Sequence, residues 1–221
     1  MISAVAATLV LSIFPANAPP PSRFLALGDS YTIGESVAEA DRWPNQLLRA
    51  LRARKTIVAD SEVIAKTGWT TDELSAAIDA AKPHGPYALV TLLIGVNNQY
   101  RGRDAEQYRK EFVGLLHRAI GFAGGDAKHV IVVSIPDWGA TPFAEGRDRA
   151  KIGAEIDHFN AVAREEAMRA GAHYADVTPI SRHASTDPAL VAPDGLHPSA
   201  KMYAQWVSVI LPQAEAALQG R

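Results

Sequence analysis

The feature that most constrains the fold is an almost continuous apolar run over residues 87–94. A strand with one face in water alternates polar and apolar residues, and this run does not. Such a run is typical of a strand covered on both faces, which occurs almost only in parallel sheets flanked by helices. Residues 87–94 are therefore predicted to form the central strand of a parallel sheet.

Four further strand-like runs alternate with helix-like stretches along the chain. The runs cover residues 23–27, 56–64, 129–135 and 172–177, and the helical patterns cover 39–54, 71–81, 104–122, 147–170 and 199–218. Strands that alternate with helices predict right-handed crossovers and a doubly wound parallel sheet. A length of 221 residues suits one such domain. We therefore expect an α/β protein, a single-domain three-layer α/β/α sandwich on a parallel five-stranded sheet.

The first strand-like run ends abruptly at Gly28-Asp29-Ser30. Because this tripeptide follows a strand, we expect Ser30 at the carboxyl end of the sheet, where open α/β sheets bind their ligands. A serine there has an exposed hydroxyl and nearby backbone N–H groups, which suit a nucleophile that attacks a carbonyl carbon. Gly, Asp and Ser are also ordinary turn residues, so the tripeptide alone favours a plain turn.

A histidine suited to activate this serine lies near the end of the chain, in Pro193-Asp194-Gly195-Leu196-His197-Pro198. A serine hydroxyl needs a base to remove its proton, and histidine is the usual base near neutral pH. The histidine in turn needs a carboxylate that fixes its tautomer and stabilises the imidazolium. Asp194 and His197 supply both groups from one loop. Asp29 and Asp137 also lie near the strand ends, but the three-residue spacing favours Asp194 as the orienting carboxylate.

Two segments in the middle of the chain supply groups for an oxyanion hole. Gly68 lies in Lys66-Thr67-Gly68-Trp69, where a glycine lets the backbone approach a substrate oxygen closely. Asn97 follows the predicted central strand and carries a side-chain amide donor. We expect the backbone N–H groups of Ser30 and Gly68, together with the Asn97 amide, to hold an oxyanion.

The four blocks together resemble the SGNH (GDSL) hydrolase superfamily, which is named after a serine, a glycine, an asparagine and a histidine. In this sequence they fall on Ser30, Gly68, Asn97 and His197. The resemblance spans residues 23–211 and includes Asp194, three positions before the histidine. It implies a flavodoxin-like strand order and a serine esterase similar to bacterial esterases and lysophospholipases, acting on lipid, lysophospholipid or acylated-carbohydrate esters through an acyl-serine and without metal or organic cofactor. Tyr31 departs from the leucine of the family name, at a position that packs rather than reacts.

Several residues near the motif ends are candidates for lining the substrate pocket. They are Trp69, Asn98, Tyr100 and Trp138, and Phe143 lies in a similar position. Aromatic residues usually serve packing, but substrate pockets are themselves mostly apolar with a few polar groups. Arg101 is either a solvated surface residue or a partner for an anionic head group.

The composition of the chain and the spacing of its histidines limit the classes of function that it can have. A net charge of −2 gives no electrostatic reason to expect nucleic-acid binding, and the chain has no cysteine for disulfides, thiolate metal sites or a nucleophile. Its histidines form no His-Glu-x-x-His spacing. Two other classes stay open: a metal phosphoesterase with Asp29, Asn97 and His197 as ligands, and a non-catalytic carbohydrate- or lipid-binding module. The expected partner is a small-molecule ester, with transient contact to lipid, and no pattern sets an oligomeric state.

Residues 1–21 form a segment of their own before a hydrolase domain over residues 22–221. An apolar run over residues 1–14 is followed by Ala16-Asn17-Ala18 and three prolines. The run is short for a bilayer span and is typical of a signal peptide with an Ala-x-Ala site. No Lys or Arg precedes it, and Pro19 would follow the scissile bond. We expect export to the periplasm or the medium, with a tether formed by an uncleaved N-terminal segment as the alternative.

Overall fold

The computed structural model describes residues 22–219. Its strands are β1 (Ser22–Asp29), β2 (Val58–Lys66), β3 (Leu89–Leu93), β4 (Val130–Val133) and β5 (His173–Ala175). Its longer helices are α2 (Trp43–Ala53), α3 (Thr71–Ala81), α5 (Ala105–Phe122), α6 (Arg149–Ala170) and α8 (Ala200–Gln219). Its short helices are α1 (Ser30–Ile33), α4 (Val96–Tyr100) and α7 (Thr178–Arg182).

The predicted signal segment over residues 1–21 lies outside the described residues, so export stays a prediction from the sequence. Among residues 22–219, no helix is both long and apolar enough to cross a membrane.

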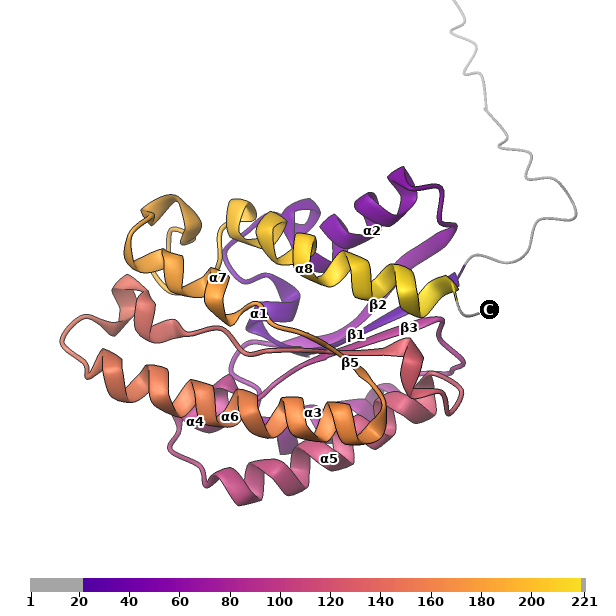
Figure 1. The fold of residues 1–221 in the computed structure, drawn as a ribbon, viewed down its shortest axis with the longest axis horizontal. Helices are drawn as coiled ribbons and strands as arrows, with labels where there is room; N and C mark the ends of the chain where they lie inside the picture. Colours follow the sequence, from indigo (N-terminus) through magenta and orange to yellow (C-terminus); the bar gives the residue numbers. More distant parts are fainter. Residues whose placement is uncertain (1–21, 220–221) are drawn as a thin grey trace, which may run out of the picture.

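All five strands run parallel, in the order β2-β1-β3-β4-β5. This order confirms the predicted three-layer sandwich and its flavodoxin-like sheet. Helices α1, α2, α7 and α8 lie on one side of the sheet, and α3, α4, α5 and α6 lie on the other (Figure 1). Because parallel strands share a direction, the segments that follow β1, β2 and β3 all leave the sheet at one edge.

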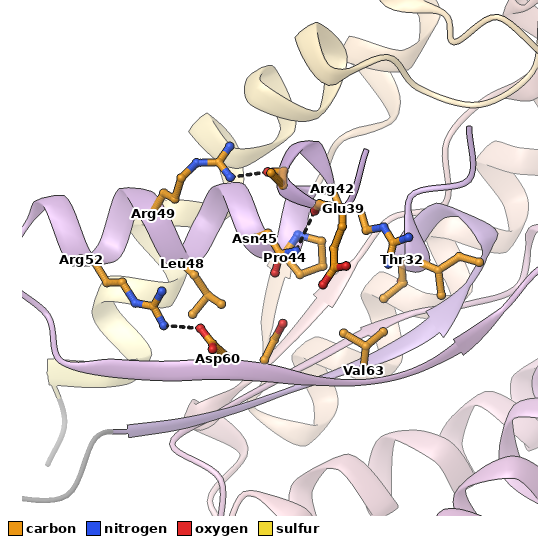
Figure 2. Close-up of a pocket in the computed structure, with 13 residues that line it drawn as sticks. Thr32, Glu39, Arg42, Pro44, Asn45, Leu48, Arg49, Arg52, Asp60 and Val63 are labelled. Carbon is orange, nitrogen blue, oxygen red and sulfur yellow. Dashed lines mark hydrogen bonds and ion pairs between the residues drawn. The ribbon is translucent and has the colours of Figure 1, made fainter. Parts of the chain in front are cut away.

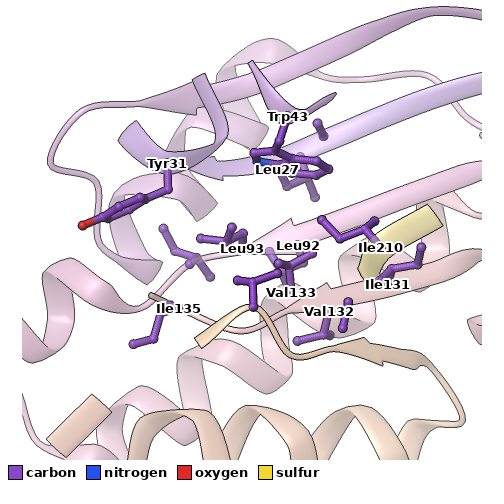
Figure 3. Close-up of a cluster of buried hydrophobic side chains, with 14 of the residues drawn as sticks. Leu27, Tyr31, Trp43, Leu92, Leu93, Ile131, Val132, Val133, Ile135 and Ile210 are labelled. Atoms are coloured by element: carbon purple, nitrogen blue, oxygen red, sulfur yellow. The ribbon is translucent and has the colours of Figure 1, made fainter. Parts of the chain in front are cut away.

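The predicted central strand is buried along its whole length. Every residue of β3 is buried, and its neighbours in register come from β1 and β4, which pair Leu27 with Leu92 and Leu92 with Val132. Figure 3 shows these strand side chains together with Trp43 of α2 and Ile210 of α8. Removal of this apolar surface from water stabilises the fold by roughly 25 cal/mol for each Å² buried.

The helix predicted over residues 39–54 is divided in the structure. Glu39–Asp41 forms a 3-10 turn, Arg42 has an extended backbone, and α2 begins at Trp43 with Pro44 in its first turn. Proline suits this position because its φ is already helical and its missing N–H would have no partner inside the helix. A capping box formed by Thr70 and Glu73 opens α3.

Candidate active site

Strand β1 delivers Ser30 to the carboxyl edge of the sheet. The strand ends at Asp29, whose side chain caps α1 by accepting a hydrogen bond from the Tyr31 backbone N–H at 3.0 Å. Glycine is needed at position 28, because a Cβ on Gly28 would lie 2.6 Å from the Leu93 carbonyl oxygen. This tight turn leaves Ser30 only 4% exposed, so it is not the exposed serine expected from the sequence but a buried residue on the wall of a cavity.

The carboxyl group of Asp29 is fully buried, and its Oδ2 atom has no hydrogen-bond partner among residues 22–219. Burial raises the pKa of Asp29 to about 7, although the backbone N–H groups of Tyr31 and Asp29 act in the opposite direction. Between its ordinary pKa of 3.8 and this raised value, the folded protein binds a proton that the unfolded chain releases. The stability due to Asp29 is therefore greatest at low pH and is lost as the pH rises through about 7.

We expect the substitution Asp29→Asn to flatten this part of the pH–stability profile. Asparagine keeps a side-chain oxygen that can cap α1, but it does not ionise. Between about pH 5 and about pH 8, the free energy of unfolding should fall by roughly 2–3 kcal/mol more in the wild type than in the variant. Urea unfolding at both pH values measures this difference. Equal slopes would mean that Asp29 titrates in the fold as it does in the unfolded chain.

A closed loop places Asp194 and His197 before α8. Val191 and Pro198 form an isolated antiparallel bridge, and the Ala192 N–H donates to the His197 carbonyl oxygen at 2.7 Å. The segment between these contacts is a short turn with Asp194 near its tip. The backbone of the loop is thus fixed by its own hydrogen bonds.

Within the loop, Asp194 is held by hydrogen bonds at both carboxylate oxygens. Its Oδ2 atom lies 2.7 Å from His197 Nδ1 and accepts a hydrogen bond from the Ser36 hydroxyl at 2.6 Å. Its Oδ1 atom accepts from the backbone N–H groups of Leu196 and His197, each at 2.9 Å. Partial burial acts to raise the pKa of Asp194, but these hydrogen bonds outweigh it and lower the pKa below its ordinary value. Asp194 is therefore ionised at neutral pH, as an orienting carboxylate must be.

Ser30 and His197 line the same cavity. In the described structure, no hydrogen bond joins their two side chains. Catalytic hydrogen bonds are often long before substrate binds and shorten in the complex. The imidazole is supported by Tyr31, whose ring centroid lies 5.1 Å from that of His197. Tyr31 is itself buried, so it packs against the imidazole at the position where the family name has leucine.

The amide of Asn97 reaches this cavity from α4. Its Nδ2 atom donates to the Trp69 carbonyl oxygen at 2.9 Å, which ties it to the segment that contains Gly68. An amide nitrogen has two hydrogens, so one remains for a substrate oxygen. Gly68 has φ 84, a left-handed conformation that favours glycine. Arg101 braces this segment by donating to the Gly68 carbonyl oxygen at 2.6 Å, and its guanidinium lies 3.3 Å from the Glu73 carboxylate.

The cavity beside Ser30 has a volume of about 140 Å³ and a mostly apolar wall. Its lining residues are Ser30, Tyr31, Val96, Asn97, Tyr100, Trp138, Phe143, Leu196 and His197. The rings of Tyr100, Trp138 and Phe143 form a cluster, and the Arg147 guanidinium lies 5.3–5.4 Å from all three ring centroids. Gln99 fixes one wall, since its Oε1 atom accepts a hydrogen bond from the Trp138 indole N–H at 2.7 Å.

Two of the four predicted pocket residues, Asn98 and Trp69, do not line this cavity. Asn98 is fully buried, and its amide accepts from the Thr71 backbone N–H and donates to the Thr71 hydroxyl, so it anchors the start of α3. Trp69 is half-buried and packs against the hydrophobic core. Adjacent residues of a helix point in different directions, so only one of Asn97 and Asn98 faces the cavity.

The Asp137 carboxylate, the alternative candidate for the orienting group, contacts Arg182 and Gly139. It lies 2.9 Å from Arg182 Nε and accepts a hydrogen bond from the Gly139 N–H at 2.9 Å. It therefore joins α7 to the segment after β4, while Asp194 contacts the imidazole.

A larger cavity of about 520 Å³ lies between α2 and the edge strand β2 (Figure 2). Two of its arginines are engaged in contacts: Arg52 pairs with Asp60 at 2.8 Å, and Arg49 donates to the Ala40 carbonyl oxygen. Ser30 and His197 are not among its lining residues. The residues that line the smaller cavity, rather than its volume, therefore identify it as the candidate active site.

Comparison with solved structures finds the same fold in known proteins. TesA has a TM-score of 0.69 at 19% identity, with 89% of this chain and 99% of that chain covered. The psychrotrophic esterase EstA from Pseudoalteromonas sp. has a TM-score of 0.65 at 15% identity, covering 90% and 100%. Axe2, an acetylxylan esterase from Geobacillus stearothermophilus, has a TM-score of 0.65 at 18% identity, covering 87% and 94%.

Comparison with curated protein sequences gave no significant match. The model of the GDSL-like lipase/acylhydrolase family, however, matches residues 26–205, a range that includes every predicted catalytic residue. The family predicted from the sequence motifs is thereby confirmed. The chain belongs to the GDSL-like lipase/acylhydrolase family and is a carboxylic ester hydrolase.

Proposed function

We propose that this protein is a serine esterase that cleaves carboxylic esters through an acyl-enzyme on Ser30. The observation that carries the proposal is the ionised Asp194 bonded to His197 Nδ1, with the imidazole and Ser30 on the wall of one cavity. In this arrangement Asp194 sets the tautomer of His197, so that Nε2 is the basic nitrogen available to the serine.

In the first half-reaction, the Ser30 Oγ atom attacks the ester carbonyl carbon, and His197 Nε2 accepts the hydroxyl proton. The carbonyl oxygen becomes an oxyanion, which the N–H groups of Ser30, Gly68 and the Asn97 side chain stabilise. When the tetrahedral intermediate collapses, the C–O bond to the alcohol breaks. His197 gives its proton to the leaving alkoxide, and the acyl group stays on Ser30.

In the second half-reaction, water takes the place of the alcohol. His197 Nε2 removes a proton from the water as its oxygen attacks the acyl carbon, and the same donors hold the second oxyanion. Collapse breaks the bond to the Ser30 Oγ atom, which recovers its proton from His197. The carboxylic acid leaves, and the enzyme returns to its starting state.

The size of the cavity favours short acyl groups. An enclosed apolar cavity of about 150 Å³ holds one benzene molecule, so the cavity of about 140 Å³ beside Ser30, which opens to solvent, covers roughly the first four to six carbon atoms of an acyl chain. Pockets that enclose drug-sized ligands are usually about 300–1,000 Å³. The name of the structural neighbour Axe2, an acetylxylan esterase, fits a short acyl group as well. We therefore assign short-chain esters, rather than long-chain lipids, as the substrate class.

We expect acetyl and butyryl esters of p-nitrophenol to be hydrolysed with kcat/KM at least roughly 10-fold above that of the dodecanoyl ester. Trp138→Leu widens the apolar wall and should move the preference toward the octanoyl ester. Phe143→Leu, at the more exposed edge of the cluster, is the matched control and should move it less. Steady-state kinetics on the ester series measures both effects. Equal kcat/KM for all chain lengths, unchanged by Trp138→Leu, would contradict the size limit.

A chelator separates this function from a metal phosphoesterase. The phosphoesterase would need the Asp29 carboxylate as a ligand, but that group is fully buried and caps α1. Turnover of the butyryl ester that persists in excess EDTA and is lost in Ser30→Ala supports the serine esterase. Loss of turnover in EDTA would support the metal enzyme, and turnover of any kind is incompatible with a purely binding module.

A further inference from the structure

The loop that follows the nucleophile carries a residue with an unusual backbone. Ser36 has φ 63, in the left-handed region that non-glycine residues seldom adopt. Two other non-glycine residues in the described chain have positive φ, Lys55 and Lys82, and both follow the ends of helices, where left-handed residues are common. Ser36 lies two residues beyond the cap of α1, so helix termination does not account for it.

The loop is fastened to the nucleophile turn. The backbone N–H groups of Gly34 and Glu35 both donate to the carbonyl oxygen of Ser30 itself, the second at 3.0 Å. The Glu35 carboxylate also accepts a hydrogen bond from the Thr67 hydroxyl. Ser36 is therefore held at a defined place relative to Ser30.

From this place the Ser36 hydroxyl reaches a residue 158 positions away, donating to Asp194 Oδ2 at 2.6 Å. A distance this short is typical of a hydrogen bond to an ionised carboxylate. The same oxygen lies 2.7 Å from His197 Nδ1, and two backbone N–H groups occupy Oδ1. A carboxylate has about four acceptor sites, and all four of those on Asp194 are used.

We propose that Ser36 is a positioning residue of the catalytic site, which fixes the Asp194 carboxylate against His197 and ties this pair to the turn that carries Ser30. The inference rests on the proposed serine mechanism. Two backbone N–H groups hold Oδ1, and the second donor at Oδ2 prevents the carboxylate from rotating away from the imidazole. The left-handed backbone of Ser36 is an unfavourable conformation, and it directs the hydroxyl to that oxygen.

The substitution Ser36→Gly tests the proposal with little risk to folding, because it removes the hydroxyl and glycine accepts the left-handed backbone freely. We expect kcat on p-nitrophenyl butyrate to fall roughly 5- to 30-fold, with KM changed by no more than about twofold. Ser36→Asn, which tolerates the left-handed backbone and supplies an amide N–H donor, should recover part of the lost kcat. The matched control is Ser199→Ala, which removes a hydroxyl that donates to the Ala189 carbonyl oxygen and accepts from the Met202 N–H, with no hydrogen bond to Asp194 or His197 in the described part of the chain, and which should leave kcat unchanged.

A second readout does not depend on turnover. The proton on His197 Nδ1 gives a downfield NMR resonance that reports its hydrogen bond to Asp194. Ser36→Gly should shift this resonance, and Ser199→Ala should not. A wild-type kcat together with an unmoved resonance in Ser36→Gly would overturn the proposal. If Ser30→Ala remains active in the same assay, the serine mechanism itself fails, and the resonance still decides whether Ser36 positions Asp194.

Discussion

Ser30→Ala and His197→Ala should each lower kcat for p-nitrophenyl butyrate by roughly 10⁴- to 10⁶-fold. In the proposed mechanism, Ser30 supplies the attacking oxygen and His197 moves the proton in both half-reactions, and no other residue that lines the cavity replaces either of them. The expected residual rate comes from the oxyanion donors and from substrate binding. Steady-state kinetics measures the loss, and circular dichroism checks that the fold is kept.

Asp194→Ala is expected to lower kcat less than His197→Ala does. In the proposed mechanism, Asp194 orients the imidazole and stabilises the imidazolium without moving a proton itself, so this variant should keep more activity than His197→Ala. Residues that act as a unit lose activity non-additively, and the double variant should be scarcely worse than His197→Ala alone. If Asp194→Ala matches the wild type, the hydrogen bond between Asp194 and His197 is not part of catalysis.

Asn97→Ala should lower kcat by roughly 10²- to 10³-fold with little change in KM. The amide is expected to donate to an oxygen that becomes fully negative only in the transition state, so its removal acts on the chemical step rather than on binding. The same kinetic assay measures both constants.

The neighbouring Asn98 provides a control of the same residue type. Its amide bonds to Thr71 and does not line the cavity, so Asn98→Ala should lower the stability of the fold more than kcat. If Asn97→Ala raises KM alone, Asn97 binds the ground-state substrate and other donors form the oxyanion hole. If Asn98→Ala lowers kcat as strongly as Asn97→Ala, the loss of activity in both variants comes from a change in local structure and not from the loss of an oxyanion donor.

The layers were predictable because they follow from patterns that extend over many residues, and the strand order was implied by the resemblance to the SGNH superfamily. The apolar run over residues 87–94 needs cover on both faces, and β3 has it. That Ser30 and Asn97 lie at the same edge of the sheet follows from the parallel direction of the strands alone. Element ends were harder to predict: the extended backbone at Arg42, which divides the helix predicted over residues 39–54, has no apolar periodicity to mark it.

The cavity wall depends on side-chain direction and on distant contacts, which a linear pattern does not encode. Asn97 and Asn98 are the same residue type one position apart, and only the packing of α4 turns the first toward Ser30 and the second toward Thr71. The role proposed for Ser36 was missed because its partner lies 158 residues away. A serine in a surface loop carries no signal for such a contact until the fold brings both loops together.

The most direct test of the serine mechanism is covalent labelling with a p-nitrophenyl phosphonate, followed by mass spectrometry of the intact protein and of its peptides. The structural neighbour EstA was solved inhibited by monoethylphosphonate, which makes this reagent class a suitable choice. A single adduct on the peptide that contains Ser30, formed as activity is lost and absent in Ser30→Ala, is the predicted result. An adduct of equal yield in Ser30→Ala, or full esterase activity in the labelled protein, would contradict Ser30 as the nucleophile.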